Sequence, residues 1–190
     1  MVRVLRAADR RQVPWKNGGG VTAEIAISPG GAALDAFDWR VSTAVVAADG
    51  PFSRFEGIDR QLVVLDGALR LVVDGRQPLD LTPLSPPAVF PGEAATHAAL
   101  TGGPVRDLNI MTRRGVVTAT IAPMAAGAEV AAGAGDCLLF AVTAAEGTVV
   151  GALQPGDALL LGAGGLVRLG HGGVLAIHFQ RAAVLPAAAI

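Results

Sequence analysis

Short apolar stretches, each closed by glycine, proline or aspartate, recur along the whole 190-residue chain. In residues 21–27 apolar and polar side chains alternate, which is the two-residue period of a β-strand. Asp74-Gly75 is a strong hairpin signal between two such stretches. Short strands at this spacing predict an all-β sandwich or barrel. We expect strands at 21–27, 39–44, 62–65, 68–73, 78–81, 88–90, 105–111, 137–142, 158–161 and 174–179, with residues 147–151 leading to the turn before 158–161.

The strand pattern starts again after Gly115. The turn Leu153-Gln154-Pro155-Gly156-Asp157 precedes an apolar strand, and residues 81–85 contain a weaker form of the same turn. Strands, a turn of this kind and further strands are typical of a cupin-type jelly roll. We therefore predict a double-stranded β-helix (jelly-roll) present twice, a bicupin, with an N-terminal half at 1–115 and a C-terminal half at 116–190.

Charge and composition exclude several classes of function. The net charge is −1 and both signs are interspersed, so neither nucleic acid nor an anionic membrane is expected as a partner. The single cysteine, Cys137, cannot form an internal disulfide. The N-terminus has no apolar signal core, and no uninterrupted apolar run has the length of a membrane span. These features predict a cytoplasmic protein.

The groups able to do chemistry lie in the first half. Twelve of fourteen arginines and twelve of sixteen acidic residues fall within residues 1–114. The only lysine, Lys16, and one of the two asparagines, Asn17, occur in Pro14-Trp15-Lys16-Asn17-Gly18-Gly19-Gly20. A lysine retained in an arginine-rich chain indicates a need for a compact ammonium group. We place the site in the first half and give the second half a packing role.

The residues needed for a catalytic metal or a nucleophile are missing. A cupin metal site needs two histidines one residue apart, a carboxylate and a further histidine, but His97, His171 and His178 are scattered. Cys137 lies in an apolar stretch, where a thiol is usually inert. The triple glycine is followed by a strand and by no Lys-Ser/Thr pair, so it is not a phosphate loop. We expect no metal, no cofactor and no catalytic residue.

Several motifs together resemble the HutD/Ves family. They are PWKNGGGVTAEIA (14–26), FDWRVSTA (37–44), DGPFSRFEGIDR (49–60), LDG (65–67) and DLNIMTRR (107–114), and they come in the family's order and spacing. The resemblance implies a bicupin fold. It also implies a link to histidine utilisation, in which the family's members bind a small pathway acid such as N-formylglutamate and moderate the pathway.

The residue chemistry agrees with a pocket for a small carboxylate. Lys16 offers a point charge, the guanidinium groups of Arg40 and Arg60 can fork a carboxylate, and Asn17 and Asn109 suit an amide or formamide group. Glycines bring main-chain N–H groups close to a ligand. An alternative for Arg40 is an ion pair with Asp38 or Asp59, and Trp15 and Trp39 are read as core residues. The predicted ligand-binding residues are Lys16, Asn17, Gly18, Glu24, Arg40, Arg60, Asn109 and Arg113.

The sequence predicts a metal-free binding protein for a small carboxylate metabolite. One alternative is a metal-independent cupin enzyme, an isomerase or epimerase, with His97 or Glu24 as general base. Another is a stress-response protein that acts as an interaction scaffold. We also expect a homodimer, because sheets with so few charges beyond residue 115 can form an apolar interface.

Overall fold

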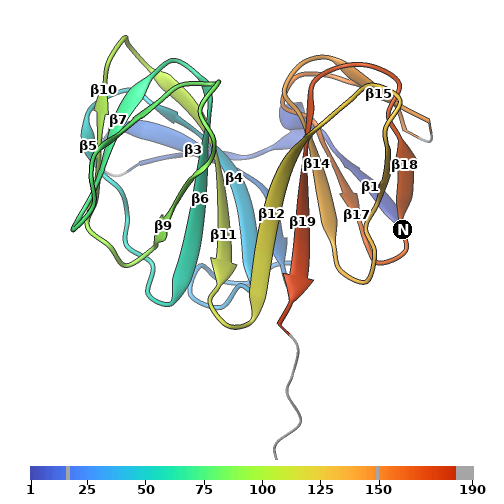
Figure 1. Cartoon of the computed structure of the whole chain (residues 1–190), viewed down its shortest axis with the longest axis horizontal. Helices are drawn as coiled ribbons and strands as arrows, with labels where there is room; N and C mark the ends of the chain where they lie inside the picture. Colours follow the sequence, from blue (N-terminus) through green and yellow to red (C-terminus); the bar gives the residue numbers. More distant parts are fainter. Residues whose placement is uncertain (16–17, 149, 183–190) are drawn as a thin grey trace, which may run out of the picture.

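The computed structural model describes residues 1–15, 18–148 and 150–182, which form an almost entirely β protein (Figure 1). The described residues contain no α-helix, and their single helical segment is the short 3-10 helix η1 (Ala7–Asp9). Within this part of the chain, no helix has the length and apolar character needed to cross a membrane. The prediction of an all-β fold is confirmed.

The N-terminal half consists of two antiparallel sheets. The larger sheet has the spatial order β2 (Gln12–Pro14), β3 (Gly20–Ser28), β4 (Trp39–Val46), β11 (Val105–Arg113), β6 (Ile58–Asp66) and β9 (Ala88–Pro91). The smaller sheet has the order β5 (Gly50–Pro51), β10 (Thr96–Leu100), β7 (Leu69–Val73) and β8 (Leu79–Leu81).

The C-terminal half repeats this scheme with one sheet and two ribbons. The sheet has the order β1 (Val2–Leu5), β17 (Ala158–Leu161), β14 (Cys137–Ala141), β19 (Val174–Arg181) and β12 (Val117–Met124). The ribbons pair β13 (Glu129–Ala131) with β18 (Leu166–Arg168), and β15 (Ala145–Gly147) with β16 (Gly151–Leu153). The two halves lie side by side, so the predicted bicupin is confirmed (Figure 1).

Strand β1 belongs to the later sheet although it opens the chain. It pairs with β17 from Val2 opposite Leu161 to Leu5 opposite Ala158. The chain then crosses through η1 and enters the larger N-terminal sheet at β2. The division into residues 1–115 and 116–190 stays a prediction, and this pairing adds that residues 2–5 lie with the second half.

The two halves pack through the large sheets that face each other in the middle of Figure 1. One apolar cluster joins β4 and β11 of the first half to β14 and β19 of the second. At its edge the Trp39 and Phe179 rings stack, with centroids 4.2 Å apart. Because side chains alternate along a strand, Trp39 and Val41 turn toward this cluster and Arg40 and Ser42 turn the other way.

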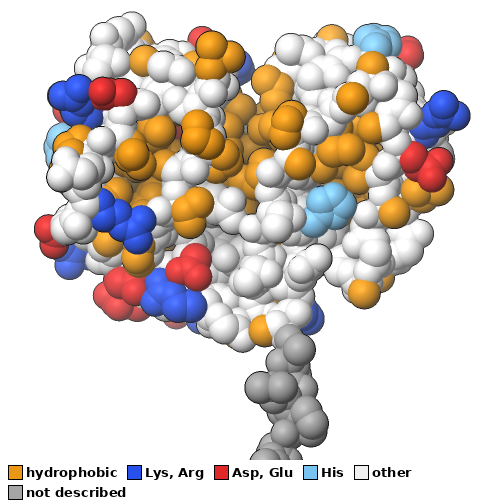
Figure 2. Space-filling view, in the orientation of Figure 1, with side chains coloured by type: hydrophobic (Ala, Val, Ile, Leu, Met, Phe, Trp, Pro, Cys, Tyr) orange, Lys and Arg blue, Asp and Glu red, His pale blue; other side chains and the backbone are white. Residues whose placement is uncertain are grey.

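The opposite faces of these sheets line the interiors of the two halves. The C-terminal interior is packed with aliphatic side chains around Leu139, Leu159 and Leu161. In the N-terminal half, one apolar cluster lies at the Val105 end of β11 and another at the Met111 end. Between these two clusters, the inward face of β11 carries the polar residues Asp107 and Asn109. Figure 2 shows that the charged side chains visible on this face are concentrated on the N-terminal half.

Candidate functional site

A cavity of about 500 Å³ lies inside the N-terminal half and is referred to below as the inner pocket. Strands β4, β6 and β11 supply most of its polar side chains, and the segment between β5 and β6 supplies aromatic rings. A second cavity of about 750 Å³ shares six of its lining residues and extends toward η1. The inner pocket is lined by Val13, Pro14, Trp15, Thr22, Arg40, Ser42, Ala44, Pro51, Phe52, Ser53, Phe55, Arg60, Asp107, Asn109 and Met111.

Arg60 is a buried cation held in an aromatic cage. Arg60 is only 3% exposed. Its Cζ lies 4.9, 5.1 and 5.8 Å from the ring centroids of Phe52, Phe90 and Phe55, respectively. Its Nη1 donates to the Ser53 carbonyl at 3.2 Å, whereas its buried Nε has no acceptor among the described residues. Burial lowers the pKa of Arg60 to about 10, although the negative charge of Asp107 opposes this shift. The guanidinium therefore stays protonated at neutral pH.

Asp107 shares the pocket with Arg60 but forms no ion pair with any described residue. It is 1% exposed, and neither carboxylate oxygen has a donor at normal hydrogen-bonding geometry within the described part of the chain. Burial raises the pKa of Asp107 to about 7, although the positive charge of Arg60 works against the rise. Near neutral pH this carboxyl group is divided between its charged and its protonated forms.

Asn109 lies two residues further along β11, on the same face as Asp107. It is opposite Ser42 of β4 and Leu62 of β6 in the sheet register. Its buried Oδ1 accepts no hydrogen bond from any residue that the structure describes. An amide held in this way offers an unused acceptor to a molecule in the pocket.

Arg40 and Glu24 form an ion pair at the boundary of the two cavities. The Nε of Arg40 donates to Oε2 of Glu24 at 2.8 Å, and the Arg40 side chain is only 13% exposed. Arg40 lines both cavities, whereas Glu24 lines the outer one alone. The predicted alternative partners of Arg40 are engaged elsewhere, since Asp38 pairs with Arg181 and Asp59 with Arg114.

Trp15 forms part of the pocket wall and is anchored by a side-chain hydrogen bond. Its Nε1 donates to Oγ1 of Thr22 at 2.7 Å, and its main-chain N–H donates to the Gly20 carbonyl at 2.9 Å. Gly18 has a φ of 72°, and its N–H donates to the Trp15 carbonyl at 3.0 Å. Lys16 and Asn17, two of the predicted ligand-binding residues, lie outside the described residues.

Like Glu24 and Gly18, Arg113 is a predicted site residue that does not line the inner pocket. It lies on the same face of β11 as Asp107 and Asn109, but at the end of the strand. Its Nε donates to the Phe37 carbonyl and its Nη2 to the Asp35 carbonyl, both at 2.9 Å. Because the apolar cluster of Phe37, Ile58 and Met111 fills this end of the half-barrel, Arg113 binds the neighbouring loop instead.

Several lining residues were not among the predicted ones. The sequence did contain a signal for Asp107. This acid lies two residues before Asn109 in an apolar strand, so both side chains must point to the same face of the sheet. Phe52, Ser53 and Phe55 lie within the motif DGPFSRFEGIDR at 49–60, but only the fold shows that the rings surround Arg60. Phe90 comes from β9 and reaches the same guanidinium through its register opposite Arg60.

The histidines do not converge on the inner pocket. His97 is exposed on β10, and Nδ1 of the exposed His171 lies 3.5 Å from Oε2 of Glu146. His178 Nε2 lies 3.8 Å from Sγ of the buried Cys137, and burial raises the pKa of that thiol to about 12. Across the described residues, no three His, Cys, Asp or Glu side chains are grouped so that they could hold a metal ion.

Two jelly-roll halves in one chain, with a polar pocket inside the first, define a bicupin. The chain belongs to the HutD family, whose model matches residues 7–181. It is similar to HutD from Pseudomonas fluorescens SBW25 in a formate condition, with a TM-score of 0.85 and 31% identity, covering 96% of this chain and all of that one.

Curated relatives match over a shorter stretch. An uncharacterised 21.2 kDa protein in the hutC 3′ region of Pseudomonas putida is 43% identical over 111 residues, covering 58% of this chain and 57% of the relative. Protein Ves of Citrobacter koseri is 38% identical over 111 residues, covering 56% of each chain. The match thus spans little more than half the length of these relatives. The expected HutD/Ves relationship is confirmed.

Proposed function

We propose that this protein binds a small carboxylate metabolite in the inner pocket without a metal, and that this binding regulates histidine utilisation. Membership of the HutD family and the relative in a hutC 3′ region support the choice of pathway. An acid such as N-formylglutamate combines carboxylates with a formamide group. The guanidinium of Arg60 would bind a carboxylate, and the amide of Asn109 would accept the formamide N–H.

The observation that carries the proposal is a set of buried polar atoms without partners around one cavity. They are Nε of Arg60, both carboxylate oxygens of Asp107 and Oδ1 of Asn109, with no hydrogen-bond partner among the described residues. Each such group costs about 1–3 kcal/mol. A ligand with carboxylate and amide groups supplies the missing donors and acceptors, so its binding recovers this cost.

Calorimetric titration of chelator-treated protein with N-formylglutamate, glutamate and other pathway acids tests the proposal. A hydrogen bond to a charged group contributes about 1.5–3 kcal/mol, so Lys16→Ala, Arg60→Met and Asn109→Ala should each weaken binding roughly tenfold to a hundredfold. Arg70→Ala is the matched control, because it removes the same charge from an exposed ion pair with Asp80 on the smaller sheet. Thermal melts of every variant separate lost binding from lost folding.

Folded variants that bind these acids as the parent does would show that the ligand lies elsewhere. A parent protein that binds none of the pathway acids would contradict the carboxylate class itself. A metal retained after chelation and required for binding would contradict the metal-free part of the proposal.

A metal-independent cupin enzyme is the second candidate, and Asp107 is the observation that favours it. A general base works best with a pKa near the operating pH, and the pKa of Asp107 is raised by burial to about 7. His97 and Glu24 are poorer candidates, because His97 is exposed on β10 and Glu24 is paired with Arg40. If this reading is right, NMR will show exchange or conversion of a bound acid, and Asp107→Asn will abolish it while binding persists.

A further inference from the structure

A small cavity lies between the two halves, away from the inner pocket. Its volume is about 130 Å³, well below the roughly 300–1,000 Å³ of pockets for drug-sized ligands. It is referred to below as the inter-barrel cavity. Its lining residues are Ala7, Arg10, Gln12, Ala23, Thr43, Leu65, Arg106, Phe140, Ala141, Val142, Pro155 and Gly156.

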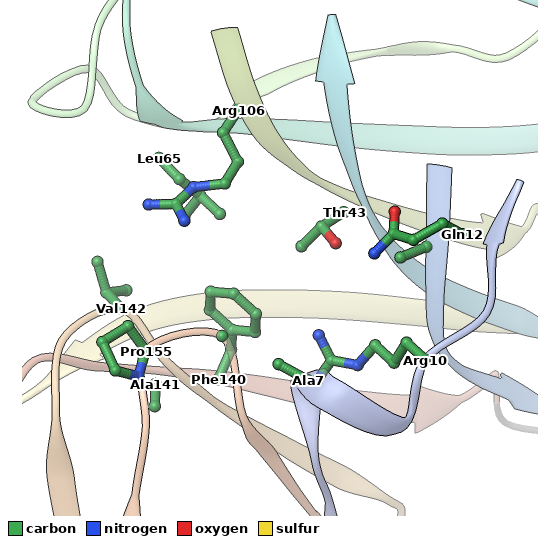
Figure 3. Close-up of a pocket in the computed structure, with 12 residues that line it drawn as sticks. Ala7, Arg10, Gln12, Thr43, Leu65, Arg106, Phe140, Ala141, Val142 and Pro155 are labelled. Carbon is green, nitrogen blue, oxygen red and sulfur yellow. The ribbon is translucent and has the colours of Figure 1, made fainter. Parts of the chain in front are cut away.

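Two guanidinium groups enter this cavity, one from the first half and one from the segment that crosses between the halves (Figure 3). Arg106 extends from β11 of the first half, beside Thr43 of β4. Arg10 follows η1, the segment that crosses between the two sheets, and Gln12 begins β2. Phe140, Val142 and Pro155 close the cavity from the second half and make that side apolar (Figure 3).

The charges of these two arginines are poorly compensated within the cavity. The guanidinium of Arg106 makes no hydrogen bond or ion pair with any described residue, although Asp66 lies opposite it in the register of β6. Nε of Arg10 is buried and has no acceptor among the described residues, while its Nη2 donates to the Leu5 carbonyl at 3.3 Å. The described lining contains no acidic side chain.

The charge of Asp157 acts on Arg10, but this carboxylate already accepts several hydrogen bonds. Its oxygens accept hydrogen bonds from Nη1 of Arg6 at 2.7 Å, the Ala7 N–H at 2.8 Å and the Gln154 N–H at 3.0 Å. These contacts hold the carboxylate at Ala7, the first residue of η1. The space between Arg10 and Arg106 is therefore left with positive charge and with hydrogen-bond donors.

We infer that the inter-barrel cavity is a second binding site, which takes a compact oxyanion of charge about −2, such as phosphate or a short dicarboxylate. Two guanidinium forks match two negative charges or a tetrahedral anion, and such charge-assisted hydrogen bonds are among the stronger ones in proteins. The Gln12 amide and the Thr43 hydroxyl add neutral donors. An anion at this position contacts η1 and β11 at once, so its binding would join the two halves.

Thermal unfolding at constant ionic strength in phosphate, malonate or chloride tests this site. Phosphate or malonate at a hundredfold excess over its Kd should raise the Tm by about 5–10 °C relative to chloride. A larger response to phosphate indicates an inorganic anion, and a larger response to malonate indicates a carboxylate metabolite. A parent protein that responds to neither beyond chloride would overturn the inference.

Variants of Arg106 test whether the anion binds in the inter-barrel cavity. This exposed side chain makes no hydrogen bond or ion pair with a described residue, so replacing it should leave the fold intact. Arg106→Gln should weaken binding of the stabilising anion roughly tenfold to a hundredfold, and Arg106→Glu should abolish it. Arg168→Gln, which removes an exposed charge on β18, should respond to the anion as the parent does. An anion response that survives Arg106→Glu would overturn the inference.

Discussion

Arg60 and Asp107 are buried side chains of opposite charge that lie in one pocket without forming an ion pair. Among the described residues, the guanidinium is surrounded mainly by aromatic rings. The carboxyl group has no donor in normal hydrogen-bonding geometry, although the Ala44 N–H acts on it and favours its charged form. Burial of a poorly compensated carboxylate is costly, so burial favours the protonated form of Asp107. The pocket can thus present a carboxyl group as a donor and a guanidinium as a fixed charge.

Because the pKa of Asp107 is raised to about 7 in the folded protein, this residue makes stability fall as pH rises. An aspartate in the unfolded chain titrates near about 3.9, so between pH 4 and 7 the folded state holds one more proton than the unfolded state. The stabilisation of the folded state by this extra proton is complete below pH 4 and is lost as the pH rises through 7. Its slope approaches about 1.4 kcal/mol per pH unit between these values.

Asp107→Asn removes this titration, so its stability should vary less between pH 4 and 7 and exceed that of the parent at pH 8. Urea unfolding at several pH values measures both quantities. Asp80→Asn, which alters an exposed carboxylate, is the control. If the parent and Asp107→Asn show the same pH dependence, the carboxyl group of Asp107 is ionised throughout this range.

At the scale of elements, the start of β3 shows how a glycine shapes the pocket wall. A Cβ on Gly20 would lie 2.5 Å from the Val45 carbonyl oxygen and 3.0 Å from the Trp15 ring. The absent side chain lets the Trp15 ring approach the strand closely while its Nε1 donates to Thr22. We expected the glycines to bring the main chain close to a ligand. At Gly20 the main chain instead lies close to the Trp15 ring.

Gly20→Ala should lower stability by about 1–3 kcal/mol, because the added methyl group must displace either β4 or the Trp15 ring. The same displacement should weaken binding in the inner pocket. Gly30→Ala is the matched control, since no atom lies within 4 Å of its Cβ position. Equal stability of the two variants in denaturant unfolding would show that Trp15 moves aside at no cost.

At the scale of the whole molecule, the two halves share the apolar cluster around Trp39 and Phe179, so we expect them to unfold together. Trp39→Ala should cost about 3–5 kcal/mol, because it leaves a cavity between the sheets. Val45→Ala, exposed on the same strand, should change stability by less than about 0.5 kcal/mol. Separate unfolding transitions for the two halves of the parent protein would contradict this view.

A homodimer stays a prediction at the same scale. The C-terminal half carries few charges, and Figure 2 shows hydrophobic side chains across the middle of the visible face. Sedimentation velocity at micromolar concentration should therefore give a dimer. A single species of about 19 kDa would contradict this expectation.

The two-residue period and the Gly, Pro and Asp turns are local signals, so the amino-acid sequence by itself determined the all-β class, the family and part of the strands, although β1, β10 and β12 were not predicted. It also identified Arg40, Arg60 and Asn109, because these residues lie in the family motifs and their side chains can bind a carboxylate or an amide group. Alternation does not say how each face is covered, which depends on sheets that are distant in sequence. Tertiary packing therefore decided that Asp107 lies without a described partner, that three phenylalanines surround Arg60, and that Arg113 binds a loop. The bulge in β3 between Glu24 and Ala26 was likewise not predictable from the sequence, because it is defined by the pairing of β3 with β4.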